Sequence, residues 1–368
     1  MLSHRLLKNL DFTVIAVTIL LVLISLVIIG SATHINNPGE DRYWYVQRQG
    51  IFAIANILFI FFLLHFDYKS LSKYANILYG VNLVMLVAVM LVGQSALGAQ
   101  RWIQIGPINL QPSEFSKLIM IISLAHILEK RQGQLKSFKD LIPIFLFVGV
   151  PFLLVLKQPD LGTSLVFLAI LFGMLFIAGI SMRHLAVIVG AGAAFMPIFW
   201  HFLKDYQKKR LTVFLDPNVD PLGSGYHIIQ SKIAIGSGMI FGKGLFAGTQ
   251  SQLNFLPENH TDFIFAVVGE ELGFIGSLII LLLYLILLYR GIKIAGAARD
   301  SFGMLLATGI TSMLTFHVLV NVGMTAGIMP VTGIPLPLMS YGVSSLTTNM
   351  ISIGILLNIY MRRQKILF

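Results

Sequence analysis

The sequence contains no cysteine among its 368 residues, which excludes disulfide bonds, thiolate catalysis and cysteine metal sites. Charge is also scarce. Asp, Glu, Lys and Arg together make up 11% of the chain, whereas a soluble surface needs roughly a quarter or more. A soluble protein is therefore excluded. Hydrophobic residues make up 56% of the chain, and many of them must face something other than water.

Apolar runs near the ~20 residues that cross a bilayer recur from end to end. They predict an all-α polytopic integral membrane protein that forms a single membrane domain over residues 1–368, without a separate soluble domain. Ten transmembrane helices are expected at 12–31, 49–66, 74–95, 113–129, 141–157, 161–181, 184–203, 263–289, 302–325 and 343–361.

Lys and Arg are distributed unevenly between the connections. With the N-terminus in the cytoplasm, the short outer loops carry only Arg42, Arg48, Arg101 and Lys157, and most other cations lie inside. This bias predicts that both termini are cytoplasmic, and it explains the net charge of +10 without nucleic acid. Residues 204–262 then form a large extracytoplasmic loop between helices 7 and 8, where we expect short interfacial helices.

Ionisable residues gather at the expected outer ends of the helices. Placing a charged side chain within or at the edge of the membrane costs roughly a few kcal/mol of free energy. Glu114 falls in the first turn of its helix, and Lys117 follows three residues later on the same face. They form either a structural ion pair or part of a site. Asp160 opens the next helix but one, as either an N-cap or the wall of a polar cavity.

Two outer segments depart from the surrounding pattern. Lys204, Lys208, Lys209 and Arg210 run against the charge bias, so either lipid headgroups or a phosphate-bearing ligand is their partner. Residues 326–341 are apolar but broken by prolines. Irregular backbone at membrane depth must be satisfied by protein or water, so this segment either lines a polar cleft or is a surface loop.

The window 256–271, LPENHTDFIFAVVGEE, places Glu258, His260 and Asp262 at the outer rim. Asp262 is either the N-cap of a helix that begins at Phe263 or an acid of a site. Glu270 and Glu271 lie eight and nine residues further along, so we expect them to do a separate job, such as hydrogen bonding to a neighbouring helix. Together these groups predict a site open to the outer leaflet.

The motifs resemble the SEDS family (shape, elongation, division and sporulation). The resembling stretches are GAQRWI…LQPSEFSK within 98–117, KQPDLGTS at 157–164, GKG…GTQSQLNFLPENHTDFIFAVVGEELG within 242–273 and GIPLPLMSYG at 333–342. Val343 departs from the pattern, which has a second glycine there. Within the family, the link from GTQSQ to LPE resembles the member that serves cell elongation more than its division paralogue.

The resemblance implies a ten-helix peptidoglycan glycosyltransferase in the bacterial cytoplasmic membrane. It implies lipid II and a growing glycan strand as substrates, and a class B penicillin-binding protein and other elongation-complex proteins as partners. The family's catalytic aspartate falls on Asp262, and its cavity residues fall on Glu114, Lys117 and Asp160. No cofactor is implied with certainty, and a divalent cation stays open, although no ligand motif demands one.

On this interpretation Asp262 takes a proton from the acceptor sugar. Arg101, Lys117 and Arg210 are the candidate cations for the leaving pyrophosphate, and His260 and Glu258 are further candidate substrate-binding residues. Two alternatives stay open at this point. A flippase for the lipid-linked precursor needs a charged path through the membrane, and a non-catalytic scaffold needs no acid or base.

Overall fold

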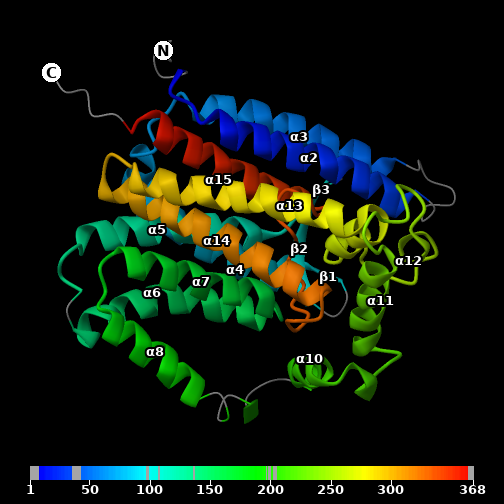
Figure 1. The fold of residues 1–368 in the computed structure, drawn as a ribbon. Helices are drawn as coiled ribbons and strands as arrows, with labels where there is room; N and C mark the ends of the chain where they lie inside the picture. Colours follow the sequence, from blue (N-terminus) through cyan, green and yellow to red (C-terminus); the bar gives the residue numbers. More distant parts are fainter. Residues whose placement is uncertain are drawn as a thin grey trace.

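A computed structural model describes residues 8–34, 43–96, 99–106, 108–135, 137–195, 197, 200–201 and 205–363. Long helices lie side by side along one direction (Figure 1). They are α2 (Phe12–Thr33), α3 (Trp44–Leu63), α4 (Ser70–Val92), α5 (Pro112–Lys130), α6 (Phe138–Lys157), α7 (Leu161–Ile177), α8 (Met182–Ala194), α13 (Ile264–Gly296), α14 (Ser301–Thr325) and α15 (Val343–Met361). Each overlaps one expected helix, although α3 begins five residues before 49 and α13 runs seven residues beyond 289.

Seven helices of the described part of the chain, α2, α3, α4, α6, α13, α14 and α15, are long and apolar enough to cross a membrane. The helices α7 and α8 are apolar but shorter, with 17 and 13 residues, and α5 carries charged residues at both ends. Part of the expected helix 184–203 lies outside the described residues. The mostly helical, multi-pass membrane class is confirmed.

The helices α14 and α15 lie at the centre of the bundle. Within their most apolar windows, 67% and 78% of the residues are buried, against 22% in α3 and α4. Apolar side chains such as Ile51, Leu58 and Val84 therefore point outward from α3 and α4. A helix that is apolar on its outer face as well as its inner face fits lipid rather than water.

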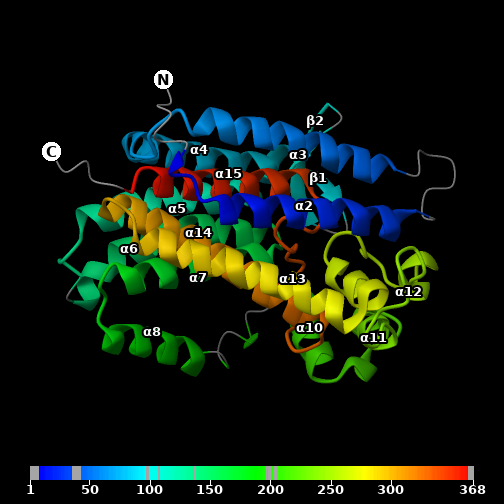
Figure 2. The ribbon, with the colours of Figure 1, turned by 45° about the horizontal axis from the view of Figure 1, so that its top comes forward.

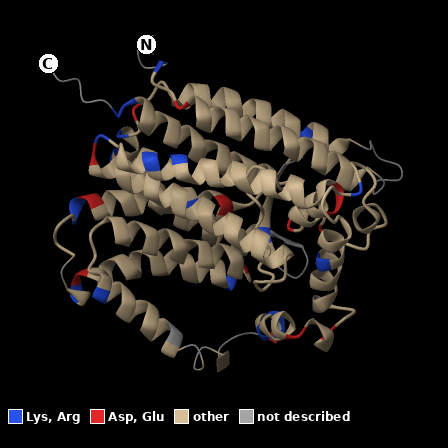
Figure 3. Cartoon of the chain, in the orientation of Figure 1, with Lys and Arg blue, Asp and Glu red and all other residues tan. Residues whose placement is uncertain are grey.

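The two ends of the described chain meet at one end of the bundle (Figures 1 and 2). Arg363 Nη1 donates to the carbonyl oxygen of Asn9 at 2.8 Å, and Arg290 Nε donates to the Asp11 carboxylate at 2.8 Å. Figure 3 shows many of the Lys and Arg residues at this end. The arrangement agrees with the expectation that both termini lie on the same side.

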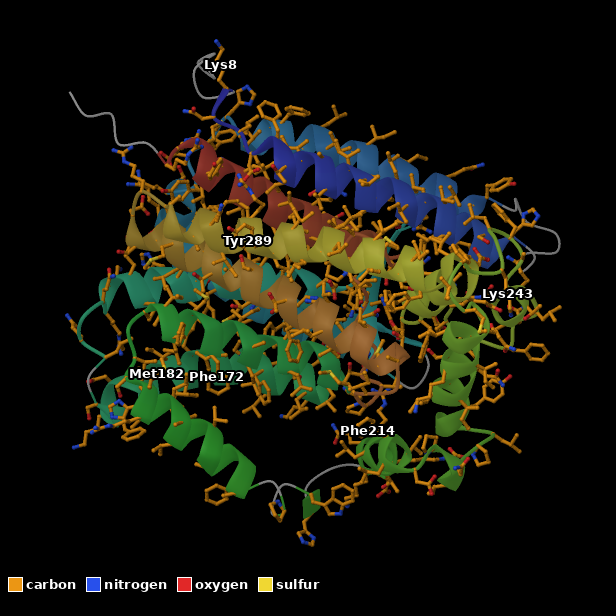
Figure 4. The ribbon with its side chains drawn as sticks, viewed as in Figure 1. Lys8, Phe172, Met182, Phe214, Lys243 and Tyr289 are labelled. Carbon is orange, nitrogen blue, oxygen red and sulfur yellow. The ribbon has the colours of Figure 1, made fainter. Side chains whose placement is uncertain are left out.

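The long connection before α13 lies at the opposite end, and Lys8 and Lys243 are well separated in Figure 4. It forms α10 (Asp205–Leu215), the 3-10 turn η1 (Pro217–Val219), α11 (Ser224–Ser237) and the short α12 (Thr249–Gln252). The expected short helices are present. However, α11 packs against α13, and its Ile228, Ser231 and Ala234 are buried against protein.

The glycine-rich stretch of this loop lies main chain against main chain along α13, a contact that we call the glycine seam (Gly238, Gly242 and Gly273). Gly273 has a φ of 66°, which breaks the helix locally, and the Cβ of a residue at Gly238 would lie 1.9 Å from the Gly269 carbonyl oxygen. Loop amides take over the freed carbonyls: Lys243 N donates to Glu270 O and Gly244 N to Glu271 O, both at 3.0 Å.

A small antiparallel sheet at the same end was missed by the sequence interpretation. Its strands are β1 (Gln94–Ala96), β2 (Ala99–Ile105) and β3 (Ile108–Leu110), in the order β1-β2-β3. Strands of three to seven residues are too short for an alternating pattern to stand out, and β1 overlaps the end of the apolar run 74–95. The sheet fills the connection between α4 and α5, and β2 carries Arg101.

Candidate functional site

A cavity of about 560 Å³ opens at the loop end of the bundle. Six of the eight predicted site residues line it: Arg101, Glu114, Arg210, Glu258, His260 and Asp262. The other two lie directly behind its wall, where Lys117 contacts Glu114 and Asp160 contacts Thr163, which is itself a lining residue. Residues that are far apart in the sequence therefore converge on one site, as predicted.

Asp262 does not cap α13. The helix begins at Ile264 with Phe263 at its N-cap position, and within the described residues no side chain bonds to that cap. The pKa of the Asp262 carboxyl is raised to about 7, mainly by burial and also by the neighbouring Glu258, while Arg210 acts to lower it. An acid with this pKa exchanges protons readily near neutral pH.

The proline-broken segment 326–341 forms one wall of the cavity together with Gly342, which follows it, so the surface-loop alternative is wrong for this wall, residues 326–342. Thr332, Gly333, Pro335 and Tyr341 line the cavity, whereas neighbouring apolar residues of the segment are buried. Gly333 has a φ of 73°, and a Cβ there would lie 3.3 Å from Asp262 Oδ2. The glycine thus lets the backbone of this wall approach the carboxylate closely.

Glu114 and Lys117 form a buried ion pair with a third partner that sequence reasoning missed. Lys117 Nζ lies 2.8 Å from Glu114 Oε1 and 2.9 Å from His317 Nε2. All three side chains are nearly inaccessible to solvent. His317 lies in the middle of an apolar helix, so a single histidine at that position gave no signal of a partner two hundred residues away.

Asp160 combines both roles considered for it. Its carboxylate caps α7 by accepting from Thr163 N at 3.1 Å and from Thr163 Oγ1 at 2.9 Å. It also lies 3.8 Å from Arg101 Nη1, while the same guanidinium donates to the carbonyl oxygens of Gln158 and Pro159. The start of α7 therefore holds Arg101 in place at the cavity wall.

The cations at the cavity differ from the predicted set. Lys117 has a side chain that is only 2% exposed and lies behind the wall, so it does not face the cavity. Arg48, which sequence reasoning noted only as an outer-loop cation, does line it, with its guanidinium 4.9 Å from the centre of the Trp44 ring. Arg48, Arg101 and Arg210 are thus the arginines of the cavity.

The basic stretch near 204–210 divides in the structure. Arg210 reaches the cavity from α10, whereas Lys209 pairs with Asp220 at 2.8 Å and is half-exposed. Lys204 lies outside the described residues. Of the described cations of the stretch, Lys208, Lys209 and Arg210, only Arg210 lines the cavity.

Aromatic rings form another part of the wall and were also missed as site residues. The Tyr45 ring lies 4.8 Å from the His260 ring and 4.9 Å from the Tyr341 ring, measured between centroids. Burial lowers the pKa of His260, so its imidazole is neutral near pH 7. Val343, the departure from the family pattern, is the first residue of α15 and lines the cavity, and the helical backbone there accommodates its side chain.

Glu270 and Glu271 do a separate job, as expected. Glu270 accepts from Lys243 Nζ at 2.8 Å and from the backbone amide of Gln250 at 2.9 Å, so it ties the loop to α13. Glu271 accepts from Ser31 Oγ of α2 at 2.6 Å. Among the residues that the structure describes, no group of three or more His, Asp or Glu side chains is arranged to hold a metal ion.

A mostly helical membrane bundle with three carboxylic acids and three arginines lining a cavity at one end defines a polytopic membrane protein with a charged, polar site. The chain belongs to the FtsW/RodA/SpoVE family, whose model, described as a cell cycle protein, matches residues 11–365. This is the SEDS family that the motifs resemble.

Among curated relatives, the chain is 44% identical to peptidoglycan glycosyltransferase MrdB of Escherichia coli K12, over 94% of each chain. It is 40% identical to stage V sporulation protein E of Bacillus subtilis, over 95% of this chain and 96% of that one. A probable peptidoglycan glycosyltransferase FtsW of a Geobacter species is 39% identical, over 97% and 98%.

Two solved structures are also similar. A chain of a peptidoglycan synthase complex, studied for coordinating polymerization and crosslinking, matches with a TM-score of 0.82 at 33% identity, covering 97% of this chain and 99% of that one. The rod shape determining protein RodA of Thermus thermophilus matches with a TM-score of 0.72 at 30% identity, covering 97% and 98%. These likenesses agree with the predicted elongation-type member.

Proposed function

We propose that this chain is a peptidoglycan glycosyltransferase that polymerises lipid II into glycan strands for cell elongation and rod shape. The observation that carries the proposal is the position of Asp262, an acid whose pKa burial raises to about 7, in a cavity that also holds three arginines. Relatives that are named glycosyltransferases favour this function over the flippase and scaffold alternatives. Within the family, the function is that of RodA rather than of FtsW.

Asp262 acts as the general base. Its carboxylate takes the proton from the 4-hydroxyl of the acceptor GlcNAc, and the hydroxyl oxygen attacks the anomeric carbon of the donor MurNAc. The bond from that carbon to the pyrophosphate oxygen breaks, undecaprenyl pyrophosphate leaves, and the configuration inverts. A base of this kind supplies roughly 10²–10⁴-fold in rate.

The arginines of the cavity stabilise the negative charge that develops on the pyrophosphate. Arg48, Arg101 and Arg210 line the cavity, and a guanidinium can donate two parallel hydrogen bonds to phosphate oxygens. Asp160 holds Arg101 at the wall, and Lys117 holds Glu114, whose carboxylate positions a sugar. In this scheme Glu258 and His260 flank the base and contact the substrate.

We place the site at the outer face of the bacterial cytoplasmic membrane. The loop-charge bias supports ten transmembrane helices with both termini in the cytoplasm, and it puts the loop 204–262 outside as part of a single domain over 1–368. Membrane lipid surrounds the bundle. The match to a chain of a peptidoglycan synthase complex supports a class B penicillin-binding protein as partner, alongside other proteins of the elongation machinery.

The proposal is tested with Asp262→Asn. Asparagine keeps the size of the side chain but cannot accept the proton, so the purified variant with its class B partner should make almost no glycan from lipid II. It should still fold and bind the partner. Near-normal polymerisation by Asp262→Asn at neutral pH would show that the base lies elsewhere, with Glu114 or Glu258 as the next candidates in the cavity.

A further inference from the structure

The backbone around Asp262 is held by an unusual set of contacts. Three consecutive carbonyl oxygens each accept a hydrogen bond from a donor in α14 or in the segment 326–342. The bonds run from Tyr341 N to His260 O at 2.9 Å, from Ser340 Oγ to Thr261 O at 2.6 Å, and from Asn321 Nδ2 to Asp262 O at 2.9 Å. These three bonds hold the main chain and leave the Asp262 carboxylate to the cavity.

Asn321 is the member of this set that joins the two walls. It is fully buried, and its Nδ2 donates to Asp262 O at 2.9 Å and to Ile334 O at 2.8 Å, so both amide hydrogens are used. Its Oδ1 has no hydrogen-bond partner among the described residues. A buried unpaired acceptor costs roughly 1–3 kcal/mol. The advantage of asparagine at this position therefore lies in the two hydrogen bonds that its Nδ2 donates, and not in stability alone.

Ser340 makes the corresponding connection from the other side. Its Oγ donates to Thr261 O and accepts from Leu336 N at 2.8 Å. One hydroxyl therefore joins the backbone beside Asp262 to the turn within the segment 326–342. Both Asn321 and Ser340 lie behind the cavity wall and away from any substrate in it.

We infer that Asn321 and Ser340 are positioning residues for the reaction, and that they form a carbonyl clamp that fixes the Asp262 main chain against the segment 326–342. The inference rests on the proposed role of Asp262 as the base. Misplacement of a reacting group by about 1 Å can cost roughly 10²-fold in rate. Hydrogen bonds to the main chain fix the position of the base without occupying its carboxylate oxygens, and the clamp does this.

The clamp also sets the environment in which Asp262 titrates. The charged or titratable groups around it are Glu258, His260, Arg210, Arg101 and Asp160, and the same cavity is also lined by Arg48, Glu114, Tyr45 and Tyr341. Burial is the largest cause of the raised pKa of Asp262, so a loosened, more hydrated carboxyl has a pKa that falls toward its ordinary 3.8. A variant that merely folds less well loses active protein but does not change the pH at which the remaining protein titrates.

The test uses the full chain with its class B partner and compares Asn321→Ala and Ser340→Ala with Thr311→Val. Thr311 is a matched control, because it is also buried on α14 but its hydroxyl donates to the carbonyl oxygen of Ala307 in its own helix, away from the clamp. We expect kcat with lipid II to fall roughly 10²-fold in the clamp variants, with KM little changed. The acid limb of the pH profile should move to lower pH, and amide hydrogen exchange in residues 256–263 should accelerate.

If one of the two clamp variants is not obtained in folded form, the other alone is sufficient to test the clamp. Clamp variants with wild-type kcat, or with a lowered rate but an unmoved acid limb and unchanged exchange, would show that the contacts are only structural. If the wild type is active and the clamp variants are unaffected, the clamp proposal is overturned and the proposed function stands. A wild type that makes no glycan from lipid II overturns the proposed function as well.

Discussion

Lys117 Nζ lies 2.9 Å from His317 Nε2, and the second nitrogen of that ring, Nδ1, lies 2.7 Å from the Met313 carbonyl oxygen. A carbonyl oxygen can only accept, so Nδ1 carries the hydrogen and Nε2 accepts from the Lys117 ammonium. The lysine therefore has two acceptors, Glu114 and His317, which hold its charge directly behind the cavity wall.

We expect Lys117→Met to lose most polymerase activity, because it leaves the buried Glu114 carboxylate without its cation. Hydrogen bonds to charged groups contribute roughly 1.5–3 kcal/mol, which corresponds to a loss of about ten- to a hundredfold. Lipid II polymerisation by purified, folded variant measures this. A normal rate for Lys117→Met would mean that the pair serves only the fold.

His317 offers a sharper comparison. His317→Leu should reduce activity, since Lys117 loses one of its two acceptors. His317→Gln should keep more activity, since the side-chain carbonyl of glutamine can accept from the ammonium. Equal rates for the two variants in the same assay would show that acceptance by His317 is unimportant.

The pH dependence of polymerisation should report Asp262. The base must be ionised, so activity should rise as pH increases through about 7 and be lost below it. Glu258 raises this pKa and Arg210 lowers it. Glu258→Gln should therefore move the acid limb to lower pH and Arg210→Gln to higher pH, as measured by kcat profiles. Shifts in the opposite directions would contradict the assignment.

The contact between α2 and the loop should contribute to stability rather than to catalysis. Ser31 Oγ donates to Glu271 and accepts from Phe246 N at 2.9 Å, so Ser31→Ala removes one hydrogen bond from a buried carboxylate and one from a loop amide. We expect a loss of roughly 1–3 kcal/mol, seen as a lower melting temperature in detergent. Ser237→Ala is the control, because its hydroxyl bonds only within its own helix. An equal effect of both variants would refute the contact's role.

The topology can be checked by cysteine labelling, since the chain has no cysteine of its own. Leu222→Cys, at a side chain that is 92% exposed, should react with an impermeant reagent added from outside. Gln132→Cys, in the connection between α5 and α6, should react only after the membrane is opened. The reverse pattern would invert the orientation and move the site to the cytoplasmic face.

Sequence reasoning predicted the helices and most of the site because both follow from local chemistry. Apolar runs marked the membrane helices, and acids such as Glu114 and Asp160 at helix starts marked the cavity end. What it missed depends on contacts between distant segments. His317 and Asn321 are single polar residues within an apolar helix, and their partners are known only once α14 is placed beside α5 and the rim segment. Arg48 was seen but could not be assigned to the cavity.

The glycine seam has a consequence for how this protein can change over evolutionary time. At Gly242 and Gly273 a Cβ would lie 2.1 Å and 2.3 Å from backbone atoms of the opposite segment, so these positions admit no side chain without separating the two segments. Main-chain atoms make the seam itself, so exposed side chains of the loop such as Met239 and Phe241 take no part in it. The outward surface of the loop can therefore diverge between lineages while the start of α13 and the acid beside it stay in the same place.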